Sequence, residues 1–326
     1  MKKIFMFAAI ISIMLASCSK EDSSSASAEK SELGISVSIS GTSNTRALVD
    51  AFTDNNQIAV FLTGANYTPK VALYTYNATS WTPPALETNK IYLSNETATV
   101  YGYYPASATI TGSTPDNDAA NTIDVTVNAT ETSFTGSGQI DYMYATGRTG
   151  TSESYLYPLA TASNATGANE VNLYLHHALA KLSFIINKAS SYTGDGTLTS
   201  VKLSKTDGFL VGEGTMALSD GTITALSTAS GIEFTGSTTI NAYNATPSTT
   251  VIAQGLAAPN SDLSGITLTL TIDGKVMTVA LPATIATWAQ GNNYTYTITV
   301  NGTELQATTV NILPWIGMNG GTGEVI

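Results

Sequence analysis

Charged residues are the scarcest class of side chain in this sequence. They make up 11% of the 326 residues, and Ser, Thr, Asn and Gly dominate the polar remainder. Exposed helices usually carry Glu, Lys and Arg, so this composition disfavours them. Thr, Val, Ile and Tyr are plentiful and favour strands. The sequence therefore predicts an almost all-β protein, and its length and 43% hydrophobic content allow about two domains.

Basic residues are scarcer than acidic ones. The chain has 13 Lys and Arg against 24 Asp and Glu, which gives a net charge of −11. The part after residue 46 carries 8 basic and 20 acidic residues. Binding to nucleic acid requires clusters of Lys and Arg that neutralise phosphates, and the sequence shows none. We therefore expect no nucleic-acid partner.

The residue types of catalytic and metal sites are also few. The two histidines, His176 and His177, are adjacent and would point to opposite faces of a strand, which favours packing or interdomain contacts over metal binding. Asp116-Asn117-Asp118 lacks the further ligands of a calcium loop and is interpreted as an acidic turn. No phosphate-binding loop, nucleophile elbow or HExxH motif occurs. We expect no enzyme, no cofactor and no metal.

The single cysteine, Cys18, excludes an internal disulfide. Lys2 and Lys3 precede an apolar run, 4–16, that suits a signal peptide and is too short to span a bilayer. The run ends in LASC, which resembles a bacterial lipobox. We predict a signal peptide over 1–17 and an acylated Cys18 that holds the precursor at a membrane. Plain secretion would leave the position of the cysteine unexplained.

A short alternating stretch follows a polar tether. Residues 33–46 read LGISVSISGTSNTR, and four apolar residues alternate there with Gly and Ser: Leu33, Ile35, Val37 and Ile39. This period of two predicts a strand with one buried face. We interpret it as a strand that fills a groove until a protease cuts between Arg46 and Ala47. The alternative is an ordinary edge strand followed by a solvated arginine.

Arg148 is the only other arginine in the chain. It lies in a Gly-flanked segment and is a rival cleavage point. A cut there would split the body of the protein instead of freeing a terminal strand, so it is the poorer site.

The rest of the chain reads as short strands separated by turns, a pattern typical of β-sandwiches. Residues 90–93 and 97–104 predict one hairpin. Residues 266–272 and 275–281 predict another, around Asp273-Gly274, because Asp-Gly suits a two-residue turn. The run 171–187 is long for one strand and is expected to bend or to include one helical turn. The polar segment 163–169 is the expected domain boundary.

Several different short motifs occur one after another along nearly the full length of the chain. They are the lipobox at Cys18, Thr45-Arg46-Ala47, the segment 52–61, Tyr74-Thr75-Tyr76 with Trp81, YGYYP at 101–105, DYMYA at 141–145, HALAKL at 177–182, Trp288 with Gly291, YTYTI at 294–298, and the segment 312–315. In this order and spacing they resemble the fimbrillin-type (type V) pilins of Bacteroidetes, which include fimbrillin-like and Mfa-like surface lipoproteins.

The resemblance implies two β-sandwich domains in tandem, transthyretin-like and Greek-key-like in topology, over 47–170 and 171–326. It also implies that an Arg-specific protease removes the lipidated segment 18–46 and that a neighbouring subunit's C-terminal strand fills the groove. Here the donor strand would lie near 308–326, with four apolar residues pointing into the groove: Val310, Ile312, Ile316 and Met318.

Physical arguments support this assignment. Burial of the four apolar side chains contributes roughly 6–12 kcal/mol before opposing terms are counted, and this contribution is lost when the strand leaves. The open groove can then pair with another strand. Head-to-tail donation does not close, so it yields a filament. Pro314 departs from the pattern, because it lacks a backbone donor and requires a bulge or an edge position.

The resemblance therefore implies a fimbrial subunit that supports adhesion and biofilm, moving from a lipid anchor in the outer membrane to a surface fimbrium. Its partners would be other pilin subunits, the maturation protease and a host or bacterial surface ligand. The alternative is a surface lipoprotein that binds a glycan or host ligand without polymerising. Trp81, Trp288, Trp315 and the 16 tyrosines would then form stacking platforms, although core roles are favoured for them.

Overall fold

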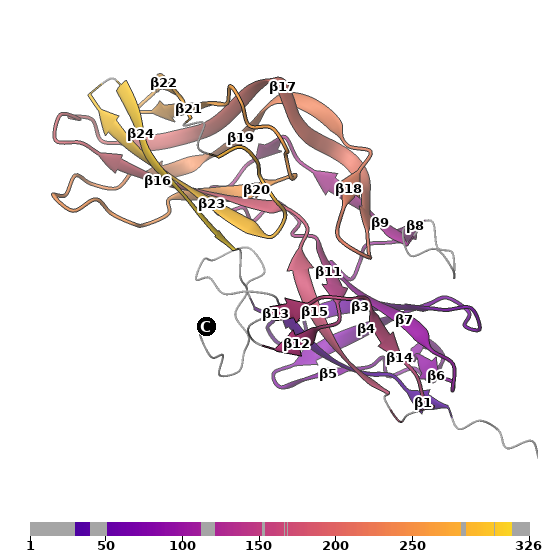
Figure 1. Cartoon of the computed structure of the whole chain (residues 1–326). Coiled ribbons are helices and arrows are strands. Elements are labelled where there is room, and N and C mark those ends of the chain that lie inside the picture. The colour runs from indigo at the N-terminus through magenta and orange to yellow at the C-terminus, as the bar shows by residue number, and fades with distance from the viewer. Residues whose placement is uncertain are drawn as a thin grey trace, which may run out of the picture.

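The fold is all-β, as predicted. The computed structural model describes residues 30–39, 51–111, 121–151, 154–165, 167, 169–281, 285–302 and 304–314. Within these ranges the only helical element is a single 3₁₀ turn, η1 (Glu87–Asn89), and no helix is long and apolar enough to cross a membrane. The strands form two lobes that meet at a narrower waist (Figure 1).

An eight-stranded sheet builds the first lobe. Its path runs β2 (Gly34–Ile39), β15 (Glu170–His177), β11 (Met143–Thr146), β7 (Ala98–Tyr104), β3 (Gln57–Thr63), β4 (Lys70–Asn77) and β5 (Ser80–Thr82), and β14 (Ala160–Ala162) also pairs with β7. The two end strands, β2 and β5, lie near each other, so the sheet curls around one apolar core. Two short pairs complete the lobe: β1 (Ser31–Glu32) with β6 (Tyr92–Leu93), and β12 (Thr149–Thr151) with β13 (Ser154–Leu156).

Two sheets build the second lobe. The larger has the path β10 (Thr130–Glu131), β19 (Ser227–Thr239), β17 (Thr197–Ala217), β21 (Thr267–Ile272) and β22 (Lys275–Ala280), with β9 (Thr122–Val127) and β18 (Ile223–Thr224) on β17 and β8 (Ile110–Thr111) on β9. The smaller is β20 (Ala253–Ala257), β16 (Ala180–Lys188), β23 (Asn292–Asn301) and β24 (Glu304–Pro314). Their inner faces enclose one apolar core, as in a sandwich.

The hairpin expected at residues 266–281 is confirmed. Strands β21 and β22 pair across Asp273 and Gly274, which have φ angles of 50° and 72°. Positive φ at both positions is the geometry that an Asp-Gly turn supplies. The neighbouring strand β17 has 21 residues and passes through two glycines with positive φ, Gly208 and Gly212, without ending.

The hairpin expected at 90–104 is wrong. β6 pairs with β1, whereas β7 lies between β3 on one side and β11 and β14 on the other. Both edges of β7 are therefore occupied, which leaves β6 no place beside it. A turn-like sequence between two apolar runs indicates only that the chain reverses there.

Strand pairing crosses the segment 163–169. β9 and β10 precede it but pair with β17 and β19 of the second lobe, and β15 follows it but pairs within the first lobe. The chain crosses between the lobes more than once, and one crossing lies at Ala178-Leu179, the bend between β15 and β16 that the run 171–187 allowed. The domain division near residue 170 stays a prediction about folding units, because the sheets themselves mix strands from both sides.

A third apolar cluster fills the waist. Its buried members come from both lobes: Ala59, Phe61, Tyr101, Tyr103, Ile123, Val125, Val127, Tyr142, Tyr144, Ala178, Leu179, Met216, Leu218, Leu256 and Ala258. The two lobes therefore share this third buried cluster, in which removal of water from apolar surface holds one lobe to the other.

Candidate functional site

The N-terminal strand β2 lies at the edge of the first lobe. It runs parallel to β15, and its residues Ile35, Val37 and Ile39 pair in register with Val171, Leu173 and Leu175. Ile35 and Ile39 are buried in the core of this lobe, and Val37 is partly buried against it. The alternation therefore faces the interior as the pattern predicted, while the removable role of the strand stays a prediction.

Leu33 is the most firmly held residue of this segment. Its side chain is fully buried, its backbone N–H donates to the carbonyl of Ile91 at 2.9 Å, and its carbonyl accepts from the Tyr74 hydroxyl at 2.6 Å. Burial, followed by the nearby Glu32 carboxylate, raises the pKa of Tyr74 well above its ordinary value. The hydroxyl therefore stays protonated and remains a donor to the strand.

Polar contacts attach β1 to the body of the lobe. The Lys90 ammonium lies 2.9 Å from the Glu32 carboxylate and 3.4 Å from that of Glu87. The hydrogen bond with Glu32 raises the pKa of Lys90. The Ser31 hydroxyl donates to the side chain of Asn164 at 2.6 Å. Exposed ion pairs contribute little, so these contacts set the position of the strand more than its stability.

The edge position makes β2 separable from the rest of the sheet. Among the described strands, β15 is its only hydrogen-bonded partner. Departure of β2 would break one ladder and leave the other pairings of the sheet in place. Three predicted processing residues, Cys18, Arg46 and Ala47, lie outside the described residues.

The predicted donor segment, 308–326, begins within β24, and β24 pairs with a strand of its own chain. β24 is antiparallel to β23 and ends its sheet, with Val310 opposite Tyr296 and Ile312 opposite Tyr294. The Ile312 side chain is 46% exposed. Pro314 is the last residue of this edge strand, a place where a missing backbone donor is tolerated. Ile316 and Met318 lie outside the described residues.

Two of the three tryptophans are core residues, as the sequence analysis favoured. Trp81 is buried with its ring 4.9 Å from Phe52. Trp288 is buried, stacks on Phe209 at 5.3 Å, and donates its Nε1–H to the Tyr296 hydroxyl at 2.8 Å. Neither ring is available as a stacking platform for a sugar. Trp315 lies outside the described residues.

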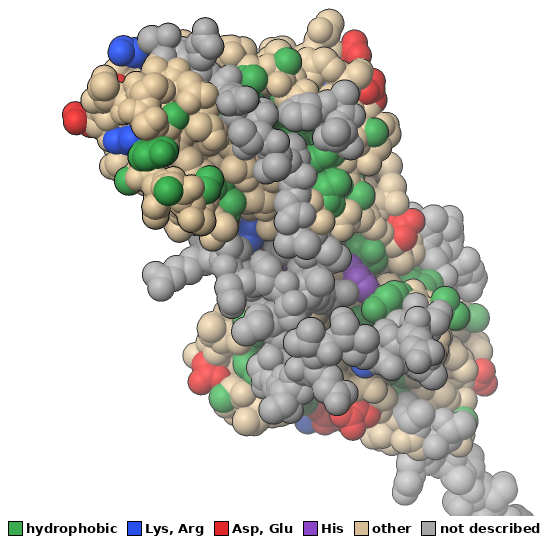
Figure 2. Space-filling model, turned by 60° about the vertical axis from the view of Figure 1, so that its left-hand side comes forward, with side chains coloured by type: hydrophobic (Ala, Val, Ile, Leu, Met, Phe, Trp, Pro, Cys, Tyr) green, Lys and Arg blue, Asp and Glu red, His purple; other side chains and the backbone are tan. Residues whose placement is uncertain are grey.

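The histidines pack near the waist. His177 is buried, with Nδ1 3.0 Å from both carboxylate oxygens of Asp141. His176 Nε2 lies 2.9 Å from the Thr146 hydroxyl, and its ring packs 4.9 Å from that of Tyr157. Burial, with a smaller effect of His177, lowers the pKa of His176 to about 4. The described residues contain no group of three or more potential metal ligands. Figure 2 shows purple, the colour of histidine side chains, between the two lobes.

Charged side chains are sparse and separated on the face shown in Figure 2. Arg148 follows β11, and its guanidinium carbon lies 4.1 Å from the ring centre of Tyr174. Tyr174 is on β15, opposite Ser38 of β2. The rival cleavage residue is thus packed against the body of the first lobe. Sequence reasoning missed this contact, because positions 148 and 174 carry no shared motif.

One family model matches most of the chain, and solved structures share its fold. A family model described as fimbrillin-like matches residues 45–315. A "putative cell adhesion protein" from Bacteroides uniformis has a similar structure, with a TM-score of 0.59 and 20% identity over 88% of this chain and 99% of that one. Another from Bacteroides ovatus has a TM-score of 0.60 and 16% identity over 89% and 100%.

A fimbrial protein from Bacteroides vulgatus is also similar, with a TM-score of 0.52 and 13% identity over 88% of this chain and 100% of that one. At these identities, the structural likeness establishes the fold. No curated protein matches the sequence.

Proposed function

The chain belongs to the fimbrillin-like family, and from this premise we propose that it is a fimbrial subunit activated by loss of its N-terminal strand. The family and its fold support a non-enzymatic adhesion protein at the cell surface. The position of β2 supports the more specific proposal that loss of this strand activates the subunit. It combines a buried apolar face, a single hydrogen-bonded neighbour among the described strands, and a downstream arginine.

Maturation would proceed by cleavage between Arg46 and Ala47. The cut leaves β1 and β2 attached by non-covalent contacts alone. Their departure would uncover the edge of β15 and the core that Leu33, Ile35 and Ile39 cover. The family match begins at residue 45, so the matched region and the proposed mature chain start at nearly the same place.

The vacated groove would accept the C-terminal strand of a second subunit. The donor residues we propose are Val310, Ile312, Ile316 and Met318. β24 is an edge strand with one hydrogen-bonded neighbour among the described strands. It can therefore leave β23 without disturbing the interior of its sheet. Each subunit would donate at one end and accept at the other, which builds a filament.

Before cleavage, acyl chains on Cys18 would hold the precursor at the outer membrane. The same cut that frees the groove also separates the body from residues 18–46 and hence from the lipid. Release from the anchor and competence for assembly would then depend on one proteolytic event.

The test uses the unlipidated precursor, residues 19–326. It is treated briefly with an Arg-specific protease and examined on a gel without boiling, beside Arg46→Ala and Arg148→Ala. We expect a ladder of multimers for the unmodified chain and for Arg148→Ala, and none for Arg46→Ala. Mass spectrometry of the product verifies the cut after residue 46.

Two results would contradict the proposal. One is a chain that stays monomeric although Arg46 is cut, which rejects a self-polymerising subunit and favours a surface lipoprotein that binds a ligand. The other is a ladder that persists in Arg46→Ala and disappears in Arg148→Ala, which would place the activating cut after Arg148.

A further inference from the structure

The backbone N–H groups of β2 alternate between the two edges of the strand. The Gly34 N–H donates toward β15, to the carbonyl of Asn169 at 2.8 Å. The Leu33 N–H points the opposite way and donates to the carbonyl of Ile91 at 2.9 Å. Because this alternation continues along an extended strand, the even-numbered residues of β2 form the hydrogen bonds with β15. The odd-numbered residues direct their N–H groups away from β15.

The odd-numbered residues of this segment also carry the inward side chains. Leu33, Ile35 and Ile39 are buried in the core of the first lobe, and Val37 is partly buried against it. The hydrogen bonds with β15 therefore use no N–H group from an inward position. A residue that lacks an N–H group can occupy such a position without the loss of a bond to β15.

The backbone of β15 shows why the direction of an incoming strand matters. In the parallel pair, each even-numbered residue of β2 bonds to the residues on either side of its register partner, so odd-numbered residues such as Leu173 direct their backbone groups into the groove. The side chain of Leu173 is also inward. A strand inserted antiparallel would place its own inward residue opposite Leu173, in a pair that exchanges two hydrogen bonds. A proline at that position would lose one of them.

The proposed donor segment contains a proline in phase with its apolar residues. Val310, Ile312, Ile316 and Met318 are all even-numbered, as is Pro314. A strand that directs the four apolar side chains inward therefore directs Pro314 inward too. Pro314 has no N–H group. Parallel insertion is thus the direction in which this segment can form every hydrogen bond that β2 forms with β15.

Burial in the precursor indicates the register. Val37 is the one inward residue of the segment that is only partly buried, so its position suits the short side chain of proline. The position of Leu33 does not suit Pro314, because the N–H there bonds to Ile91. With Pro314 at the position of Val37, the buried positions 33, 35 and 39 receive Val310, Ile312 and Ile316.

An outward position agrees with this register. Asn311 would take the place of Gly34, the register partner of Glu170. A Cβ at Gly34 would lie 3.6 Å from Glu170 Cγ, its nearest neighbour, which is an ordinary contact distance. A side chain therefore fits where β2 has a glycine.

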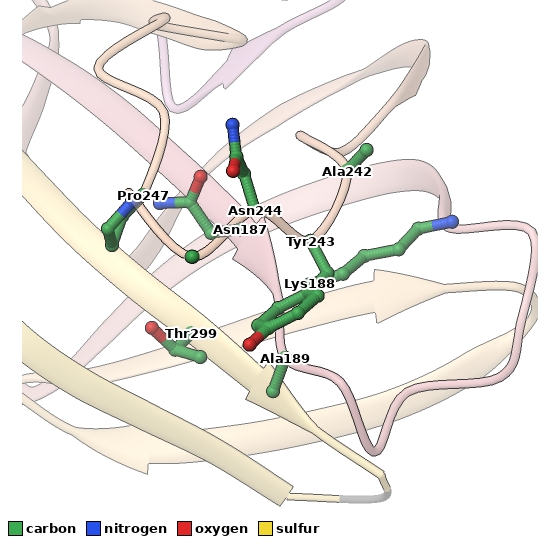
Figure 3. A pocket seen from close by; sticks show the side chains of 9 residues that line it. Asn187, Lys188, Ala189, Ala242, Tyr243, Asn244, Pro247 and Thr299 are labelled. Carbon is green, nitrogen blue, oxygen red and sulfur yellow. The ribbon is translucent and has the colours of Figure 1, made fainter.

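Departure of β24 from its own sheet leaves the pocket of the second lobe lined as before. This pocket lies at the end of β16, and its lining includes Asn187 of β16, Thr299 of β23 and Tyr243 of the segment 242–247 (Figure 3). β24 contributes none of the lining residues. The donor strand can therefore be withdrawn without removal of a wall of this pocket.

We propose that the C-terminal strand of a second copy of this chain enters the groove parallel to β15, in the direction of β2, with Pro314 opposite Leu173. This inference rests on the strand exchange proposed above and adds its direction and register. Residues 315–326 continue the strand beyond Pro314, so that Ile316 lies opposite Leu175.

The test is disulfide cross-linking within the gel ladder. The unlipidated precursor, residues 19–326, contains no cysteine, because Cys18 is the only one in the chain. In the parallel register, Asn311 of one subunit lies beside Glu170 of the next, about 4.8 Å away. With the strand reversed about Pro314, Gly317 takes that place and Asn311 lies six residues away, at about 20 Å. A disulfide requires Cα atoms within about 7 Å.

Glu170→Cys with Asn311→Cys should give a gel ladder, after Arg-specific cleavage and oxidation, that survives boiling. A reductant should collapse it to the monomer. Glu170→Cys with Gly317→Cys is the matched control and should give only the monomer after boiling. Gels run without boiling report assembly separately from strand direction, and both pairs should form the ladder there.

The outcomes separate this inference from the strand exchange on which it rests. A ladder that forms without boiling but is cross-linked through Gly317→Cys, or through neither pair, overturns the direction and register and leaves strand exchange in place. The absence of any ladder from the cleaved, cysteine-free chain overturns strand exchange, and this inference with it.

Discussion

Truncation of Leu33 to alanine tests the role of the N-terminal strand most directly. The Leu33 side chain is fully buried, and its backbone is held on both sides by bonds to Ile91 and Tyr74. The chain therefore cannot collapse into the space that the substitution leaves. Leu→Ala at buried sites costs about 2–5 kcal/mol, and a site that cannot relax belongs to the upper part of that range. We expect the precursor to lose about 3–4 kcal/mol of unfolding free energy.

The assay is urea unfolding of the unlipidated precursor, with Leu86→Ala as the matched control. Leu86 belongs to the same lobe and is 67% exposed, so its truncation should change the unfolding free energy by less than about 0.5 kcal/mol. Leu33→Ala should also speed appearance of the gel ladder after cleavage, because the cut strand is held less tightly. Equal unfolding free energies for the two variants would refute the reasoning.

Three further predictions concern the body of the protein. Because the pKa of His176 is lowered to about 4, the unfolded chain binds more protons than the folded chain between pH 4 and 6.5. The stability present above pH 6.5 is therefore lost as the pH falls, by about 2 kcal/mol at pH 5. In His176→Gln, the unfolding free energy measured in urea should depend less on pH. Gly274→Ala should cost about 1 kcal/mol in thermal unfolding, since φ is 72° and no atom obstructs a Cβ there; an unchanged midpoint would contradict this. Trp288→Phe should cost about 2 kcal/mol in urea unfolding, because the Tyr296 hydroxyl loses its partner; a smaller loss than for Trp81→Phe would contradict it.

Local patterns predicted the faces and turns of individual strands. The alternation at 33–39 identified which side chains of β2 point inward, and Asp273-Gly274 identified a tight hairpin. Both features depend on residues close in sequence, where side-chain direction and backbone angles are set by the local residue types.

The choice of strand partners could not be predicted in the same way. An alternation with a period of two indicates which face of a strand is buried, but it does not indicate which strand lies beside it. β9 has a clean alternation that would suit either lobe, and its pairing with β17 depends on contacts almost 90 residues away. The same limit applies to β6, whose partner is the N-terminal β1.

The parallel pairing of β2 with β15 also bears on how the chain folds. The paired residues are 136 positions apart, as for Ser36 and Asn172, so β2 cannot dock until most of the first lobe has been synthesised. Contacts of such long range form late, because closing the intervening loop costs entropy before any contact repays it. The strands of the first lobe that precede β15 can therefore pair while the position of β2 is still empty. A nascent chain would thus pass through a groove-open state once on the way to the precursor, well before any protease produces it again.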